Sequence, residues 1–160
     1  MALYAFEFAD GDWIKVGHCA YNPWIRAMRG FAAQVHPPQL CGKLLNLEGI
    51  TLLGLWRADL AAEKAIHRDL KGVRTGEFYA KATFKAMVLP RLEGMAPLEP
   101  PARPDPAAVR SFRDSLNRPL IDRPCCSGAP VQCFDCHRSL SSYKQLRRHR
   151  LRCPALQPRS

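Results

Sequence analysis

Residues 3–16 read Leu-Tyr-Ala-Phe-Glu-Phe-Ala-Asp-Gly-Asp-Trp-Ile-Lys-Val. Two apolar runs, residues 3–8 and 13–16, flank the triplet Asp10-Gly11-Asp12. A short turn signal of this kind between two apolar runs predicts a β-hairpin. We therefore expect the chain to begin with two antiparallel strands.

The residues after this hairpin predict a mixed fold of the α/β (α+β) class. Asn22-Pro23 is typical of a helix N-cap followed by proline in the first turn, and an apolar run after residue 49 is typical of a covered strand. The expected elements are a helix over 24–33, a strand over 50–56, an amphipathic helix over 59–71, a short extended piece over 76–79 and a helix over 83–89 that Pro90 kinks or ends.

Proline marks the end of this first region. The chain has 14 prolines, and eight of them lie between Pro97 and Pro130. Each proline fixes φ and removes a backbone donor, so the stretch predicts an extended, semi-rigid linker with one short helix around 107–116. The predicted organisation is a domain over 1–93, a linker over 94–130 and a small C-terminal unit over 131–155.

The charge of the chain is strongly positive and unevenly distributed. The formal net charge is +10, and residues 96–160 hold 12 basic but only 5 acidic residues. A basic half predicts a polyanionic partner, DNA rather than a membrane. No apolar run approaches the roughly 20 residues needed to cross a bilayer, and the N-terminus lacks the basic start of a signal peptide. Seven cysteines, an odd number, predict a reducing, intracellular (cytoplasmic) location instead of a disulfide framework.

Four residues near the C-terminus have the spacing of zinc ligands. The pattern is Cys133-x2-Cys136-x12-His149-x3-Cys153. Two thiolates two residues apart on a turn, with a His and a Cys on one face of a helix, predict a closed tetrahedral site for structural Zn²⁺. Val131, Leu140 and Leu146 stand where the small core of such a unit needs apolar side chains.

This segment resembles the two-Cys, two-His zinc-finger family, with Cys153 in place of the second histidine. The resemblance implies a ββα finger that faces the major groove of DNA with one side of its helix. Arg suits guanine and Gln suits adenine, whereas the remaining basic residues reach phosphates. The implied DNA-binding residues are Ser142, Lys144, Gln145, Arg147, Arg148 and Arg150. The alternative is a finger that binds protein or has a purely structural role.

The polar residues of the first region have an informative order. Tyr4 lies in the first expected strand, Lys15-Val16-Gly17 in the second, Arg26 early in the first helix, and Glu63 in the helix that follows the third strand. With Glu63-Lys-Ala-Ile-His67 and Gly76-Glu77-Phe78-Tyr79 further along, this order resembles the phage-type branch of the GIY-YIG nuclease superfamily. The resemblance implies a three-stranded antiparallel sheet flanked by helices.

The resemblance also implies catalytic roles in phosphodiester hydrolysis. Tyr4 would orient or deprotonate the attacking water, provided that a neighbouring cation such as Lys15 lowers its pKa. Arg26 would clamp the phosphate through its planar fork. Glu63 would hold one catalytic Mg²⁺ or Mn²⁺, and His18 and His67 would transfer protons or bind phosphate.

Each of these residues also has an ordinary structural explanation when it is considered alone. Tyr4 packs well in a strand, Arg26 suits a solvated helix face, and Glu63 and His67 can pair at i, i+4. The ordered set favours a metal-dependent DNA endonuclease with a DNA-binding zinc finger. Two alternatives stay open, a catalytically inactive DNA-binding or regulatory protein and a zinc-finger interaction adaptor. The target sequence, nicking or double-strand cutting, and oligomeric state are left open.

Overall fold

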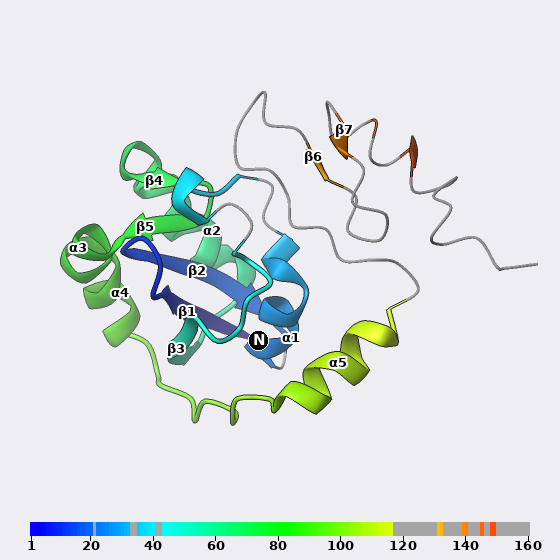
Figure 1. The fold of residues 1–160 in the computed structure, drawn as a ribbon. Coiled ribbons are helices and arrows are strands. Elements are labelled where there is room, and N and C mark those ends of the chain that lie inside the picture. Colours follow the sequence, from blue (N-terminus) through cyan, green and yellow to red (C-terminus); the bar gives the residue numbers. More distant parts are fainter. Residues whose placement is uncertain are drawn as a thin grey trace, which may run out of the picture.

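The computed structural model describes residues 1–20, 22–32, 35–40, 43–116, 131–132, 139–140, 145 and 148–149. Its centre is a five-stranded sheet in the order β3-β1-β2-β5-β4, in which every described pairing is antiparallel (Figure 1). The strands are β1 (Ala2–Phe8), β2 (Trp13–Cys19), β3 (Ile50–Arg57), β4 (Arg74–Thr75) and β5 (Phe78–Ala80).

The predicted hairpin at the start of the chain is confirmed. β1 and β2 pair from Ala2 opposite Cys19 to Phe8 opposite Trp13. The turn between them contains Gly11 at φ 94° and Asp12 at φ 58°. These left-handed conformations suit Gly and Asp, which explains why this triplet can reverse the chain so tightly.

The expectation of a three-stranded sheet is wrong, because β4 and β5 add two strands. β5 pairs with β2 from Trp13 opposite Ala80 to Lys15 opposite Phe78, and β4 pairs with β5. The sequence predicted an extended piece over 76–79 but not its partner. Gly76, at φ 62°, turns the chain between the two strands, and a Cβ there would overlap the backbone carbonyl of Val35.

Helices cover both faces of the sheet. The helices of residues 1–93 are α1 (Pro23–Met28), α2 (Leu60–Asp69), α3 (Lys81–Thr83), the wide turn η4 (Phe84–Val88) and α4 (Leu89–Glu93). A further helix, α5 (Pro106–Asp114), lies in the proline-rich stretch. Single 3-10 turns are η1 (Gly30–Ala32), η2 (Pro38–Leu40) and η3 (Lys71–Val73). Asn22 caps α1 by accepting from the Trp24 backbone N–H at 2.9 Å, as predicted.

One helix end differs from the expectation. α1 stops at Met28 instead of residue 33, because Gly30 (φ 64°) and Phe31 (φ 59°) take left-handed conformations that no helix continues. At Pro90 a kink or an end was expected, and the helix does not end there. The wide turn η4 directly precedes α4, and Pro90 stands in the first turn of α4, where its missing N–H is not needed.

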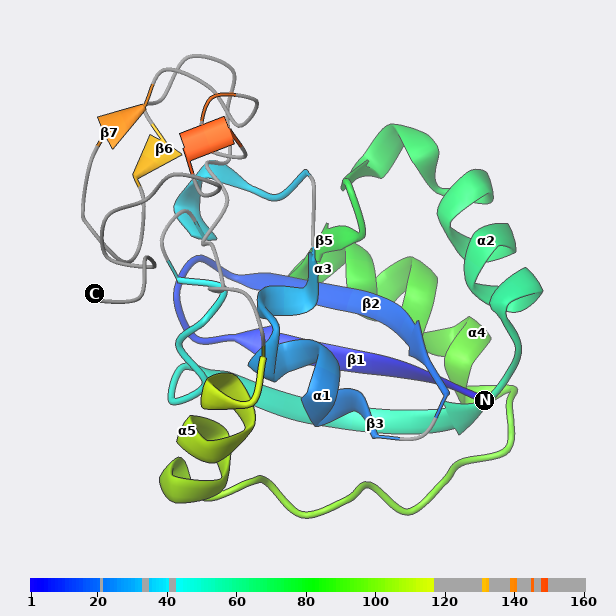
Figure 2. The ribbon, with the colours of Figure 1, turned by 90° about the vertical axis from the view of Figure 1, so that its right-hand side faces the viewer.

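The sheet separates two apolar clusters. On one face, Tyr4, Phe6 and Phe8 of β1 pack with α1 and η1, and on the other face Leu3 and Ala5 pack with α2 and α4. Figure 2 shows α1 in front of the sheet and α4 behind it. Successive residues of β1 and β2 therefore point into different layers, which decides where each polar side chain of the hairpin lies.

Residues 95–116, which we call the strap, pack against this domain. The Arg57 and Leu98 backbone N–H groups donate to the carbonyls of Ala96 and Leu55, both at 2.8 Å, so the strap covers the outer edge of β3. Further along, Trp24 Nε1 donates to the Pro101 carbonyl at 3.1 Å. α5 confirms the predicted short helix. The predicted boundary between the domain and the linker at residue 93 stays a prediction. Residues 96, 98 and 101 of the predicted linker hydrogen-bond to the domain.

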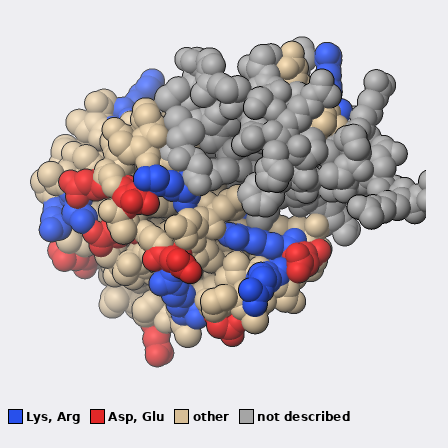
Figure 3. Space-filling view, in the orientation of Figure 1, with Lys and Arg blue, Asp and Glu red and all other residues tan. Residues whose placement is uncertain are grey.

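Two short strands are described in the C-terminal region. β6 (Val131–Gln132) and β7 (Ser139–Leu140) form an antiparallel pair with Val131 opposite Leu140. Within the described part of the chain, no helix is long and apolar enough to span a membrane. Basic and acidic side chains are interspersed over the described surface in Figure 3.

Candidate active site

The candidate site lies on β1 and β2, beside the point where β5 stops pairing with β2. Tyr4 is opposite Gly17 and Phe6 is opposite Lys15, so Tyr4 and Lys15 are diagonal neighbours on one face of the hairpin. The Tyr4 ring lies over Gly17, and a Cβ on Gly17 would overlap the Tyr4 hydroxyl. Glycine at this position is therefore required by the placement of the tyrosine.

Lys15 is a fully buried cation. Its Nζ forms an ion pair with Oε2 of Glu77, whose own side chain is 46% exposed. The rings of Tyr4, Phe31 and Phe78 surround the ammonium with centroids 5.6, 5.6 and 5.7 Å away. Burial disfavours the charge, whereas the Glu77 carboxylate stabilises it, and the pKa of Lys15 is raised overall. Lys15 thus keeps a positive charge beneath the site.

The Tyr4 hydroxyl is buried and stays protonated at neutral pH. Burial raises its pKa, and the charges of Lys15 and Arg26 lower it by less than burial raises it. Deprotonation of water by Tyr4 was expected only with a lowered pKa, and the shift is in the other direction. As a neutral phenol, Tyr4 is suited to orient a water molecule by a hydrogen bond and not to take its proton.

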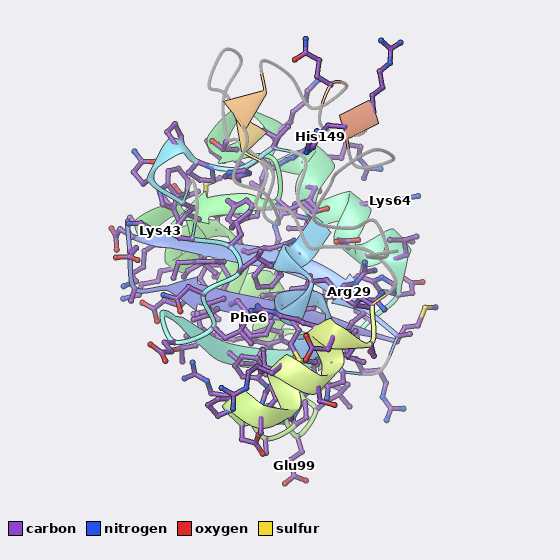
Figure 4. The ribbon with its side chains drawn as sticks, turned by 45° about the vertical axis from the view of Figure 1, so that its right-hand side comes forward. Phe6, Arg29, Lys43, Lys64, Glu99 and His149 are labelled. Carbon is purple, nitrogen blue, oxygen red and sulfur yellow. The ribbon has the colours of Figure 1, made fainter. Side chains whose placement is uncertain are left out.

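Arg26 is an exposed cation of α1. Its charge acts on both Tyr4 and Cys19, and within the described part of the chain it forms no hydrogen bond or ion pair. Arg29, the C-cap residue of α1, instead lies with its guanidinium carbon 5.5 Å from the ring centroid of Phe112 in α5. Figure 4 labels Arg29 beside α1 and α5. Arg26 is therefore the arginine of α1 that is available to an anionic ligand.

Glu63 supplies a carboxylate from α2. It is 8% exposed, and its Oε1 lies 3.8 Å from Nε2 of His67. Burial alone would raise its pKa, but the interaction with His67, followed by the charges of Lys15 and His18, holds the pKa of Glu63 below its ordinary value. The side chain is accordingly an ionised carboxylate at neutral pH.

The two expected catalytic histidines lie in different surroundings. His18 is half-buried, with Nε2 3.3 Å from Sδ of Met1, and its charge reaches Glu63. His67 is buried, and its Nδ1 lies 2.7 Å from the Tyr79 hydroxyl. His18 is therefore more accessible to solvent than His67.

The electrostatic contacts bring four of the expected residues into one group. The charges of Lys15, Arg26 and Glu63 all act on Tyr4. Sequence reasoning gave no role to Glu77 as the partner of Lys15 or to Tyr79 as the partner of His67. A buried lysine on the aromatic face of a hairpin needs a carboxylate, so the acidic residue of the expected extended piece was a usable signal. Tyr79 had no such signal.

The Glu63 carboxylate fits a hard divalent cation. Mg²⁺ binds through one or two carboxylates and takes its remaining oxygens from water and substrate phosphates. Among the described residues, no three His, Cys, Asp or Glu side chains form a group that could hold a metal by themselves. A cation at Glu63 would therefore depend on water and phosphate for the rest of its shell.

Most of the expected zinc-finger residues lie outside the described residues. These are Cys133, Cys136, Cys153, Ser142, Lys144, Arg147 and Arg150. Gln145 and Arg148 are exposed and helical, and His149 is half-buried and helical. The zinc site and the DNA-reading face stay predictions.

A cavity of about 560 Å³ lies between residues 45–48 and the part of the strap that contains α5. None of the candidate catalytic residues lines it. No protein-family model, no curated protein and no solved structure matches this chain.

Proposed function

We propose that this chain is a metal-dependent DNA endonuclease with a GIY-YIG-like N-terminal domain and a C-terminal zinc finger that binds DNA. The observation that carries the proposal is the electrostatic grouping of Tyr4 with a charged Lys15, an ionised Glu63 and Arg26, whose side chain has no partner among the described residues. Hydrolysis of a phosphodiester needs a held phosphate, an oriented water and a sink for negative charge. This group contains one residue suited to each task.

Arg26 binds the scissile phosphate, because its guanidinium has no competing partner among the described residues and can donate two parallel hydrogen bonds. Tyr4 orients the attacking water through its neutral hydroxyl. The Lys15 charge beneath Tyr4 stabilises the negative charge that develops as water bonds to phosphorus and the ester oxygen leaves. His18 is the half-buried histidine whose charge reaches Glu63, and it accepts the proton of the water.

Glu63 holds one Mg²⁺ or Mn²⁺. When bound, the cation supplies positive charge that stabilises the leaving oxygen. The low pKa of Glu63 supports this role, since a carboxylate must be ionised to hold the cation at neutral pH.

The C-terminal unit holds the nuclease domain on DNA. Residues 117–160 contain nine basic and two acidic residues, so they supply most of the net charge of +10. A tethered DNA-binding unit raises the concentration of the nuclease site near bound DNA.

Plasmid cleavage tests the proposal directly. Supercoiled DNA is incubated with the full chain in Mg²⁺ or Mn²⁺, and nicked and linear products are measured. We expect cleavage by the wild type and a loss of at least about 100-fold in Glu63→Ala and in Arg26→Ala. Lys64→Ala and Arg29→Ala are the matched controls, because they remove neighbouring charges from the same helices without touching Tyr4, and they should retain cleavage. Figure 4 shows Lys64 at the outer side of α2.

Absence of cleavage with either metal, together with salt-dependent DNA binding, would replace the enzyme with an inactive DNA-binding protein. Absence of DNA binding even at low salt would favour the interaction adaptor.

A further inference from the structure

His67 is a buried polar side chain whose role is not explained by contact with substrate. It is 8% exposed, and its Nε2 has no hydrogen-bond partner within normal distance in the part of the chain that the structure describes. Its carbonyl accepts a hydrogen bond from Arg74 Nε at 2.7 Å, which holds the C-terminal part of α2 against the β4 strand. The side chain therefore has a restrained position between Tyr79 and Glu63.

Tyr79 determines which ring nitrogen of His67 carries the proton. The Tyr79 side chain is fully buried, and burial raises its pKa to about 12, so the phenol keeps its proton at neutral pH. Its hydroxyl makes no other side-chain hydrogen bond among the described residues than the 2.7 Å contact with His67 Nδ1. If Nδ1 were the donor, the buried phenol proton would lack an acceptor, at a cost of about 1–3 kcal/mol. The hydroxyl is accordingly the donor, Nδ1 is the acceptor, and the ring proton is on Nε2.

The Nε2 proton then faces the carboxylate of Glu63. Nε2 and Oε1 are 3.8 Å apart, which is close enough for attraction and slightly too long for a hydrogen bond. A small rotation of the Glu63 side chain closes this gap. A donor that contacts one carboxylate oxygen directs the other oxygen away from itself.

We propose that Tyr79 and His67 are positioning residues that orient the Glu63 carboxylate through the Nε2–H tautomer of His67. The inference deepens the proposed function and rests on it where Glu63 is taken to hold the divalent cation. It assigns His67 to the support of the carboxylate, in place of the proton transfer or phosphate binding expected from the sequence.

The tautomer is tested on the full chain without any metal. In a uniformly ¹⁵N-labelled sample, two-bond ¹⁵N–¹H correlation spectra distinguish the protonated from the unprotonated ring nitrogen, and His67→Gln identifies the His67 signals. We expect a single Nε2–H tautomer in the wild type and a mixture of tautomers in Tyr79→Phe. A proton on Nδ1 in the wild type, or an unchanged pattern in Tyr79→Phe, overturns the proposal.

The effect on Glu63 is tested by Mn²⁺ titration, in which paramagnetic broadening of signals around α2 reports binding. We expect Tyr79→Phe and His67→Leu to need about tenfold more Mn²⁺ for half-maximal broadening. His67→Gln keeps an amide donor near the position of Nε2 and should lie closer to the wild type. Urea unfolding of each variant verifies that it is folded at the temperature used. Equal Mn²⁺ requirements in all four proteins overturn the proposal.

The two proposals fail separately. If the wild type shows the Nε2–H tautomer and the variants need more Mn²⁺ than the wild type, but the wild type cleaves no DNA, only the nuclease function is refuted. A wild type that cleaves DNA with the proton on His67 Nδ1 refutes only the role of Tyr79 and His67.

Discussion

At the scale of the residue, the buried charge of Lys15 has a cost in stability that the proposed catalysis would explain. Its ammonium is buried among three aromatic rings and compensated by Glu77, whose side chain is 46% exposed. A buried ion pair contributes little net stability, because the loss of hydration offsets the attraction between the charges. A charge kept at such a place is more easily explained by chemistry at Tyr4 than by the fold.

Lys15→Met should therefore separate stability from activity. Methionine has a similar length and is apolar, so we expect the free energy of unfolding to stay unchanged or rise by about 1 kcal/mol. DNA cleavage should fall by at least about 100-fold. Glu77→Gln, which leaves the buried ammonium without its carboxylate, should instead lose about 2 kcal/mol. Urea unfolding and plasmid cleavage measure both effects, and a loss of several kcal/mol in Lys15→Met would contradict the argument.

Gly17→Ala tests the placement of the Tyr4 hydroxyl. The new Cβ would overlap this hydroxyl, so the ring must shift while the strand itself accepts alanine. A displacement of about 1 Å at a catalytic group costs on the order of 100-fold in rate. Gly49→Ala is the control, because a Cβ at Gly49 meets nothing within 4 Å. Equal cleavage by the two variants would remove Tyr4 from the mechanism.

Tyr79 should make the stability of the protein fall at alkaline pH. Its pKa is about 12 in the folded state against 10.0 ordinarily, so folding favours the protonated phenol. The stability that this group contributes is complete below pH 10 and is lost as the pH rises towards 12. Between pH 9 and 11, the loss of unfolding free energy should be about 1 kcal/mol smaller in Tyr79→Phe than in the wild type. Urea unfolding at both pH values measures it, and identical losses would mean that the phenol ionises freely.

At the scale of the element, the strap acts as part of the domain. It hydrogen-bonds to the edge of β3, and Leu98, Val109 and Phe112 pack against the core cluster that contains Tyr4. Arg113 Nε and Nη2 donate to the carbonyls of Met28 and Leu45 at 3.1 and 2.6 Å. α5 thereby braces α1, the helix that carries Arg26.

A chain that ends at residue 94 should therefore be less stable than one that ends at residue 116. Loss of the apolar contacts and of the β3 edge bonds should lower the free energy of unfolding by about 3 kcal/mol or more. Denaturant unfolding of the two truncated chains gives the comparison. Equal midpoints would show that the domain is complete without the strap.

At the scale of the whole molecule, the positive charge is divided unequally between residues 1–116 and residues 117–160. Residues 1–116 carry 15 basic and 12 acidic residues, a surplus of only 3 out of the net charge of +10. On the face seen in Figure 3, the described residues show both signs interspersed. If the proposed binding to DNA holds, most of the attraction should come from the chain beyond residue 116.

Removal of residues 117–160 should weaken DNA binding strongly and make it less dependent on salt. Each lost phosphate contact reduces the slope of log K against log salt by about 0.9. Fluorescence anisotropy with duplex DNA at several salt concentrations measures this slope for the full chain and for residues 1–116. A zinc-selective chelator, added in the presence of Mg²⁺, should also weaken DNA binding by the full chain and reduce its dependence on salt. The reason is that a unit as small as the proposed finger needs zinc to fold. An unchanged slope would place the DNA contacts on the N-terminal domain.

Local patterns in the sequence determined the hairpin, the cap of α1, the amphipathic α2 and the short helix α5. Each depends on neighbours along the chain, where turn residues and apolar periodicity are sufficient to predict structure. The order of Tyr4, Lys15, Arg26 and Glu63 also identified the candidate site without any coordinates.

Only the tertiary structure decided what surrounds these residues. The pairing of Lys15 with Glu77, 62 positions away, and of His67 with Tyr79 depends on β5 joining β2, a non-local contact with no turn signal of its own. The raised pKa of Tyr4 likewise depends on burial by α1 and η1, since burial outweighs the charge of the adjacent lysine. The sequence by itself thus determined which groups can do chemistry, and packing decided their protonation, because desolvation is a property of the assembled core.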